Sequence, residues 1–89
     1  MTVAEFEKAV WNLEGIRIVV RASEGTIVGD YKHKNRGAKM DTVSEWRDRR
    51  VASCLGDLEF VIVDGNGEHA HGNMKLQTLR ETYLSALAA

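Results

Sequence analysis

The chain has 89 residues, of which 44% are apolar and 28% are charged, and its formal net charge is −1. This length fits one domain with one core, and the composition is that of a folded chain rather than a disordered one. The balanced charge excludes the strong positive field of a general DNA-binding protein and the dense negative field of a nucleic-acid mimic. We therefore expect residues 1–89 to form one compact domain with local electrostatic contacts.

A helix is expected over residues 3–14. Thr2 and Glu5 have the spacing of a capping box, and Gly15 stands where the helix can end. Apolar residues recur at steps of three and four, which predicts one stripe facing a core: Val3, Phe6, Val10 and Leu13. Trp11 lies off this stripe. It either packs at the flank of the core or stands partly exposed as an anchor for a partner.

Two strands are expected next. Apolar residues alternate from Ile16 to Ala22, which is typical of a strand with one buried face. After the turn-like residues 23–25, residues 26–31 form a second β-like run, so the pattern predicts an antiparallel hairpin. Arg17 and Arg21 fall on the same side of the first strand, and its exposed face is therefore expected to be half basic.

A long loop and a second helix follow. Residues 32–41 have no periodic pattern and contain four of the 12 basic residues, so they are expected to form a loop. A helix is expected over 43–55, again after a capping box. Its apolar stripe is poor, because Arg47 and Arg50 share its side. These arginines must extend to solvent, pair with acids or reach a partner.

The C-terminal third is expected to contain a central strand and a last helix. Residues 58–63 are the most apolar stretch, 64–67 have turn composition, and a short edge strand can follow over 68–71. The last helix is expected to begin at Asn73 as N-cap, with this stripe: Leu76, Leu79, Tyr83, Ala86 and Leu87. The order α-β-β-α-β-α predicts an α+β fold whose small, mostly antiparallel sheet has helices packed on one face.

Catalytic and metal-binding signals are weak. Asp64, His69 and His71 together have the chemistry to ligate a divalent metal, since both imidazoles would point the same way from an extended segment. No helical histidine motif or second cluster completes such a site, and a polar loop is the preferred interpretation. Cys54, the single cysteine, excludes an intramolecular disulfide and is interpreted as a structural thiol. We expect no enzyme activity, no metal and no cofactor.

Basic residues form the stronger candidate site. The open sheet face together with the loop over 32–39 is one expected contact surface, where cations can meet phosphate or protein and an aromatic side chain can stack. The arginine-rich second helix is another. The alternative is a solvated face balanced by nearby acids. The candidate partner-binding residues are Arg17, Arg21, Tyr31, Lys32, Lys34, Arg36, Arg47 and Arg50.

Three stretches resemble a known group of proteins. Glu5–Trp11 with Ile16–Arg21, and Phe60–Gly65 continued to Leu76, are similar in overall style to small phage and mobile-element proteins that include type I anti-CRISPR proteins. The resemblance covers most of the chain, contains no shared motif and carries over no functional residue. It implies a compact protein of the host cytoplasm that blocks a CRISPR effector complex by occupying its surface. The near-neutral charge differs from the acidic members that mimic DNA.

Other properties follow from the sequence as expectations. The alternative function is a small nucleic-acid-binding regulator that uses a local basic patch. A homodimer is compatible with an uncovered strand edge on so small a body. The chain has no run of about 18 apolar residues, so no membrane partner is expected. The single cysteine and the absence of a signal-like N-terminus favour the cytoplasm.

Overall fold

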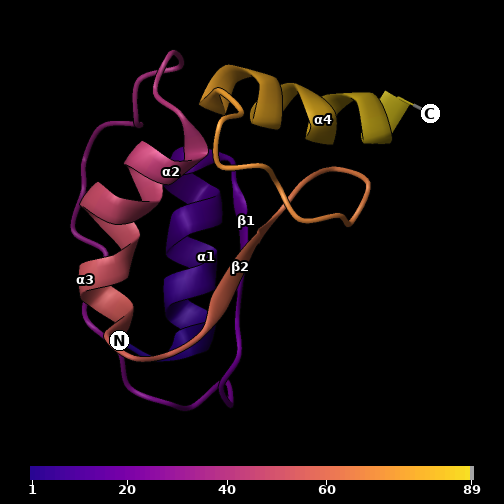
Figure 1. The fold of residues 1–89 in the computed structure, drawn as a ribbon. Helices are drawn as coiled ribbons and strands as arrows, with labels where there is room; N and C mark the ends of the chain where they lie inside the picture. Colours follow the sequence, from indigo (N-terminus) through magenta and orange to yellow (C-terminus); the bar gives the residue numbers. More distant parts are fainter. Residues whose placement is uncertain (89) are drawn as a thin grey trace.

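The computed structural model describes residues 1–88, and it confirms the α+β class (Figure 1). A helix and a strand come first, a continuous second helix with a π-helical turn follows, and a second strand and a last helix end the chain. In chain order the elements are α1 (Val3–Glu14), β1 (Arg17–Val20), α2 (Val43–Trp46), η1 (Arg47–Val51), α3 (Ala52–Leu55), β2 (Phe60–Val63) and α4 (Leu76–Ala88).

The sheet consists of β1 and β2, which pair antiparallel with Ile18 opposite Ile62. The expected alternation of β1 is confirmed, because Ile18 and Val20 are buried and their neighbours are exposed. One face of the sheet therefore packs on the core with the helices. The other face is open to solvent.

The expectation of a strand over residues 26–31 is wrong. The segment forms only an isolated bridge, between Ile27 and Thr2. Its main chain instead bonds to the start of α1, where the Val3 N–H donates to the Thr26 carbonyl at 2.8 Å. β1 pairs with the more apolar β2, which lets both strands bury one face on the same core.

The second helix contains one extra residue in a turn. The N–H of Ala52 donates to the carbonyl of Arg47, five residues earlier, as in a π-helix. This turn spans the five-residue step from Trp46 to Val51, and both side chains are buried. At 3.6 residues per turn, Trp46 and Val51 do not fall on the same side of a helix, and the apolar stripe therefore looks poor in the sequence. The π turn restores one core-facing side and directs Arg50 inward.

The last helix begins at Leu76 rather than at Asn73. Leu76, Leu79 and Tyr83 are buried, as the stripe predicts, but Leu87 on the same stripe is 82% exposed. The end of α4 extends beyond the rest of the domain (Figure 1). The expected edge strand over 68–71 is reduced to a single bridge between β2 and its following loop.

Candidate functional site

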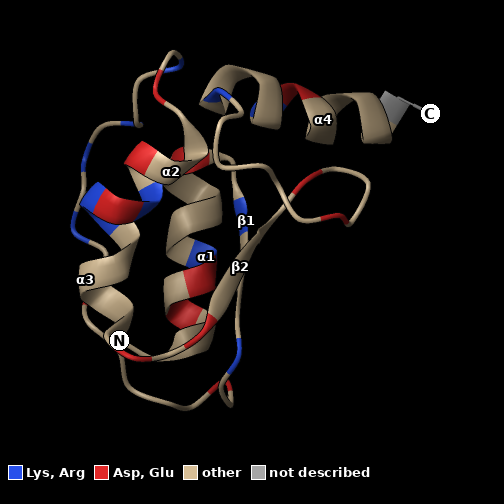
Figure 2. Ribbon diagram, in the orientation of Figure 1, with Lys and Arg blue, Asp and Glu red and all other residues tan. Residues whose placement is uncertain are grey.

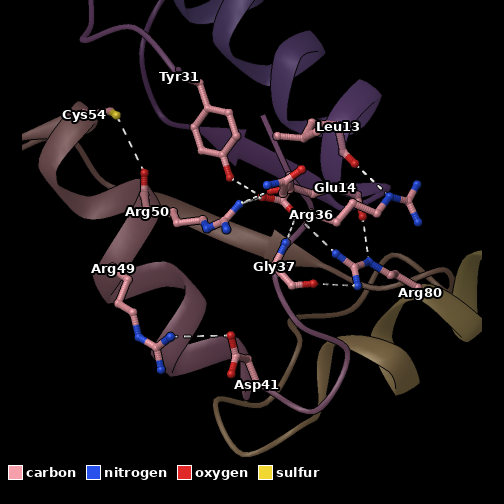
Figure 3. Close-up of polar contacts among 11 residues, drawn as sticks. Leu13, Glu14, Tyr31, Arg36, Gly37, Asp41, Arg49, Arg50, Cys54 and Arg80 are labelled. Atoms are coloured by element: carbon pink, nitrogen blue, oxygen red, sulfur yellow. Dashed lines mark hydrogen bonds and ion pairs between the residues drawn. The ribbon is translucent and has the colours of Figure 1, made fainter. Parts of the chain in front are cut away.

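A carboxylate is buried at the end of α1. Glu14 is 0% exposed, and four groups bond to its side chain (Figure 3). Its Oε2 accepts from the hydroxyl of Tyr31 at 2.5 Å and from Nη1 of Arg50 at 2.9 Å. Its Oε1 accepts from the Gly37 N–H at 2.8 Å and from Nη2 of Arg80 at 3.1 Å. We call these five residues the Glu14 cluster.

The surroundings of Glu14 keep it ionised. Burial raises the pKa of Glu14, but the hydrogen bonds from Tyr31 and Gly37 and the charge of Arg50 outweigh burial, so that the pKa lies below its ordinary value. Burial, assisted by the bond to Glu14, raises the pKa of the Tyr31 hydroxyl. Burial lowers the pKa of Arg80, which remains charged because a guanidinium keeps its proton in proteins. The cluster thus contains one anion, two cations and a neutral phenol.

The Glu14 cluster joins four segments of the chain: the end of α1, the loop over 31–37, the second helix and α4. Main-chain carbonyls at the end of α1 are also capped by arginines: Nε of Arg36 donates to Leu13 at 2.8 Å, and Nε of Arg80 donates to Glu14 at 2.7 Å. The carboxylate has no surface exposure and all its bonds are internal, so it has no access to a substrate. Its geometry is that of a structural ion cluster rather than of a catalytic acid or base.

Three of the eight candidate partner-binding residues bond inside the protein. Tyr31 and Arg50 belong to the Glu14 cluster, and Arg36 caps α1. Nη1 of Arg50 also donates to the carbonyl of Asn35 at 2.6 Å, which holds the loop against the second helix. These three side chains therefore stabilise the fold through internal hydrogen bonds. Glu14 itself has a signal in the sequence: it follows Val10 by four residues and so falls on the buried stripe of α1.

The other basic candidates are solvent-facing. Arg17, Arg21, Lys32 and Lys34 are exposed, and Arg47 is partly exposed. The loop that bears the lysines lies beside the second helix, as its basic residues in Figure 2 show. The hydrogen bond from Arg50 to the Asn35 carbonyl holds this part of the loop at the second helix rather than on the open sheet face, with which the sequence pattern had grouped it. Two cationic regions result, one on the strand and one on the loop and second helix.

The open sheet face continues onto α1 and α4. Trp11 is 44% exposed and packs edge-on against Tyr83, with ring centroids 5.4 Å apart. One hollow of about 400 Å³ and another of about 220 Å³ adjoin this tryptophan, and Trp11 and Arg17 line both of them. Exposed apolar side chains lie around Trp11 and Arg17. We define the Trp11 face as Trp11, Arg17, Val19, Ala86 and Leu87.

Tyr83 attaches α4 to the sheet below this face. Its hydroxyl accepts from the N–H of Arg17 at 2.9 Å and donates to the carbonyl of Val63. The hydroxyl thereby bridges two residues that stand opposite each other in the β1–β2 register. Burial raises the pKa of this hydroxyl, so it stays protonated near neutral pH. This bridge holds α4, which bears Leu87, against the sheet.

Of the candidate metal ligands, Asp64 has a structural role. Oδ1 of Asp64 accepts from the N–H groups of Asn66 and Glu68, at 2.8 and 3.0 Å, and so closes the turn after β2. His69 and His71 are exposed. Within residues 1–88, no group of three histidine, cysteine, aspartate or glutamate side chains is placed to hold a metal ion.

Comparison of the chain with protein-family models, curated proteins and solved structures finds no match. Among the helices described, none is long and apolar enough to cross a membrane.

Proposed function

We propose that this protein is a non-enzymatic binding module that occupies the surface of another protein through its Trp11 face. The observation that carries the proposal is the half-exposed tryptophan beside Arg17, at the junction of two hollows. Tryptophan and arginine dominate the energetic centres of protein interfaces, where a partner removes them from water. A tryptophan held in place by an aromatic neighbour also loses little side-chain entropy on binding.

The surroundings of this face favour a protein partner. Val19 is 42% exposed and Leu87 is 82% exposed, so apolar contact area is available around the central pair. Arg17 has no ion pair within residues 1–88, and its guanidinium is free to bind a carboxylate or carbonyl of a partner. Glu14 is the only fully buried carboxylate among the described residues, and its oxygens bond to groups inside the protein. This arrangement supports a function without catalysis.

The partner we propose is a CRISPR effector complex, on the basis of the resemblance to small anti-CRISPR proteins. The experiment expresses the protein in bacteria with an active type I CRISPR system and measures both phage survival and co-purification of effector subunits. The test variant is Trp11→Ala with Arg17→Glu, and the control with two reversed charges elsewhere is Lys32→Glu with Lys34→Glu. We expect the test variant to lose at least tenfold in both readouts and the control to lose neither.

The outcomes separate the parts of this proposal. Wild-type protein that captures no effector subunit and protects no phage contradicts the proposed partner. A test variant that remains folded and retains full inhibition contradicts the Trp11 face.

A nucleic-acid-binding regulator is the second candidate. Lys32, Lys34 and Lys39 project from the loop beside the second helix without an ion pair in the described part of the chain. Such cations release counterions when they neutralise phosphates, so binding would weaken steeply with salt. A gel shift at low salt tests this function: retention of DNA or RNA that is lost in Lys32→Glu with Lys34→Glu supports it, and no retention by the wild type contradicts it.

A further inference from the structure

The second strand has a free edge at its start, around Phe60. The N–H of Arg21 bonds to the carbonyl of Glu59, so these residues form a hydrogen-bonded pair at the end of the ladder. Hydrogen-bonded and non-bonded pairs alternate along antiparallel strands, and Phe60 and Ile62 therefore direct their main-chain groups away from β1. The Ile62 carbonyl accepts from Ala70 at 2.9 Å. Within residues 1–88, the N–H of Ile62 and both main-chain groups of Phe60 have no such partner.

A hollow of about 680 Å³ adjoins this free edge, between β2 and the second helix. A smaller hollow of about 130 Å³ shares three of its residues and continues toward His69. The shared residues are Arg47 from the helix and Phe60 and Val61 from the strand. Ala52 and Leu58 add apolar surface to the larger hollow. A strand edge beside an apolar hollow is the arrangement used when an extended peptide is added to a sheet.

The charges of the hollow favour an acidic ligand. Arg21 and Arg47 line it together with a single acid, Glu59. Arg47 pairs only with its neighbour Asp48 within the described residues, at 3.5 Å, and their side chains are 43% and 71% exposed. An exposed pair of this length contributes little, so the Arg47 guanidinium is available to another carboxylate.

We propose that the free edge of β2 binds an extended peptide segment with an acidic side chain, which adds a third strand to the sheet. The peptide main chain bonds to Phe60 and to the N–H of Ile62, and its acidic side chain pairs with Arg47. The segment is short, because the loop bearing His69 and Ala70 already bonds to the Ile62 carbonyl and pairs with Val63. This site goes beyond the proposed Trp11 face and uses Arg47, which that face does not contain.

The test selects random peptides on the immobilised wild-type protein and measures the binding of the selected peptides by fluorescence polarisation. Three proteins are compared: wild type, Arg47→Glu and the control Arg49→Glu. Arg49 lies on the same helix, is exposed and pairs with Glu45 outside the hollow. We expect peptides enriched in aspartate or glutamate between β-branched residues. We also expect binding at least tenfold weaker to Arg47→Glu and changed less than threefold in the control.

Amide hydrogen exchange locates the binding site independently of the variants. The bound peptide should slow exchange at Phe60 and Ile62, whereas Val61, already paired with β1, should change little. Peptides without acidic enrichment, equal binding to wild type and Arg47→Glu, or unprotected Phe60 and Ile62 amides would overturn the proposal. A protein that sediments as a dimer with these two amides already protected would overturn it too, because a second copy would then cover the edge.

Discussion

The Glu14 cluster and the Trp11 face use similar residue types in opposite ways. In the cluster, Arg50 and Arg80 point inward and each bonds to a buried carboxylate. On the face, Arg17 points to solvent beside an exposed tryptophan. Buried charges must be paired and fully bonded, since desolvation is costly. Exposed apolar side chains differ, because they contribute favourable free energy only when a partner removes them from water.

This difference separates residues that hold the fold from residues that can bind a partner. Tyr31, Arg36 and Arg50 have fixed partners inside the chain, so replacing them should disturb stability first. Arg17 and Trp11 have much of their surface in water, so replacing them should disturb binding first.

Removal of the central carboxylate should have the largest effect. Glu14→Ala leaves Arg80 and the Gly37 N–H without their buried acceptor, and one-sided loss of a buried pair costs about 3–5 kcal/mol. Urea unfolding followed by circular dichroism measures the change in the free energy of unfolding. The sheet-face variant Arg17→Glu serves as control. A loss below about 1 kcal/mol would show that the cluster contributes little to stability.

A methyl group at Gly65 should disturb the contact between the β2 turn and α4. A Cβ at this position would lie 2.0 Å from the carbonyl oxygen of Thr82, which is main chain and cannot rotate away. We expect Gly65→Ala to destabilise by about 1–3 kcal/mol, as overpacking does, and to shift α4. Gly25→Ala is the matched control, because a Cβ there meets nothing within 4 Å. Equal melting temperatures for the two variants would contradict the close approach.

Loss of the Tyr83 hydroxyl should weaken the attachment of α4 to the sheet. Tyr83→Phe removes the bridge between the Arg17 N–H and the Val63 carbonyl but keeps the ring against Trp11. We expect a loss of about 1–2 kcal/mol, because both main-chain groups lose a partner. Thermal melting measures the loss, and tryptophan fluorescence should change little. A variant as stable as the wild type would indicate that water replaces the hydroxyl.

Acid should remove the stabilisation that ionised Glu14 provides. The folded-state pKa of Glu14 lies below the unfolded value, so the unfolded state binds the proton first as the pH falls. The stabilisation is complete above about pH 5 and decreases through the folded-state pKa, by about 1.4 kcal/mol per unit of pKa difference. Urea midpoints between pH 7 and pH 3 should fall more steeply for wild type than for Glu14→Gln. Parallel curves would contradict the depressed pKa.

Charge reversal on the open face should have the smallest effect on stability. The side chain of Arg17 is exposed, and its main-chain bond to Tyr83 does not depend on the guanidinium. We expect Arg17→Glu to change the free energy of unfolding by less than about 0.5 kcal/mol. A larger loss by urea unfolding would place Arg17 among the residues that hold the fold and would remove the contrast with the Glu14 cluster.

Local patterns were sufficient for most of the elements. Both capping boxes form, with Glu5 and Glu45 each accepting from its N-cap residue. The stripe of α1 and the alternation of β1 are also found. Local patterns did not reveal that residues 26–31 bond to the start of α1, because a β-like segment can satisfy its main chain in several ways. They also did not reveal the π turn, because its five-residue step differs from the periods of both an α-helix and a β-strand.

By itself, the sequence determined where the first two helices begin, which faces of α1 and β1 turn inward, and that the domain is α+β, because these depend on neighbours two to four residues apart. Only the tertiary structure decided which charges are internal. Glu14 meets Tyr31, Gly37, Arg50 and Arg80 through contacts 17 to 66 residues apart in the chain. Burial and pairing arise only when such distant segments pack together, and they distinguish a structural arginine from one that can bind a partner.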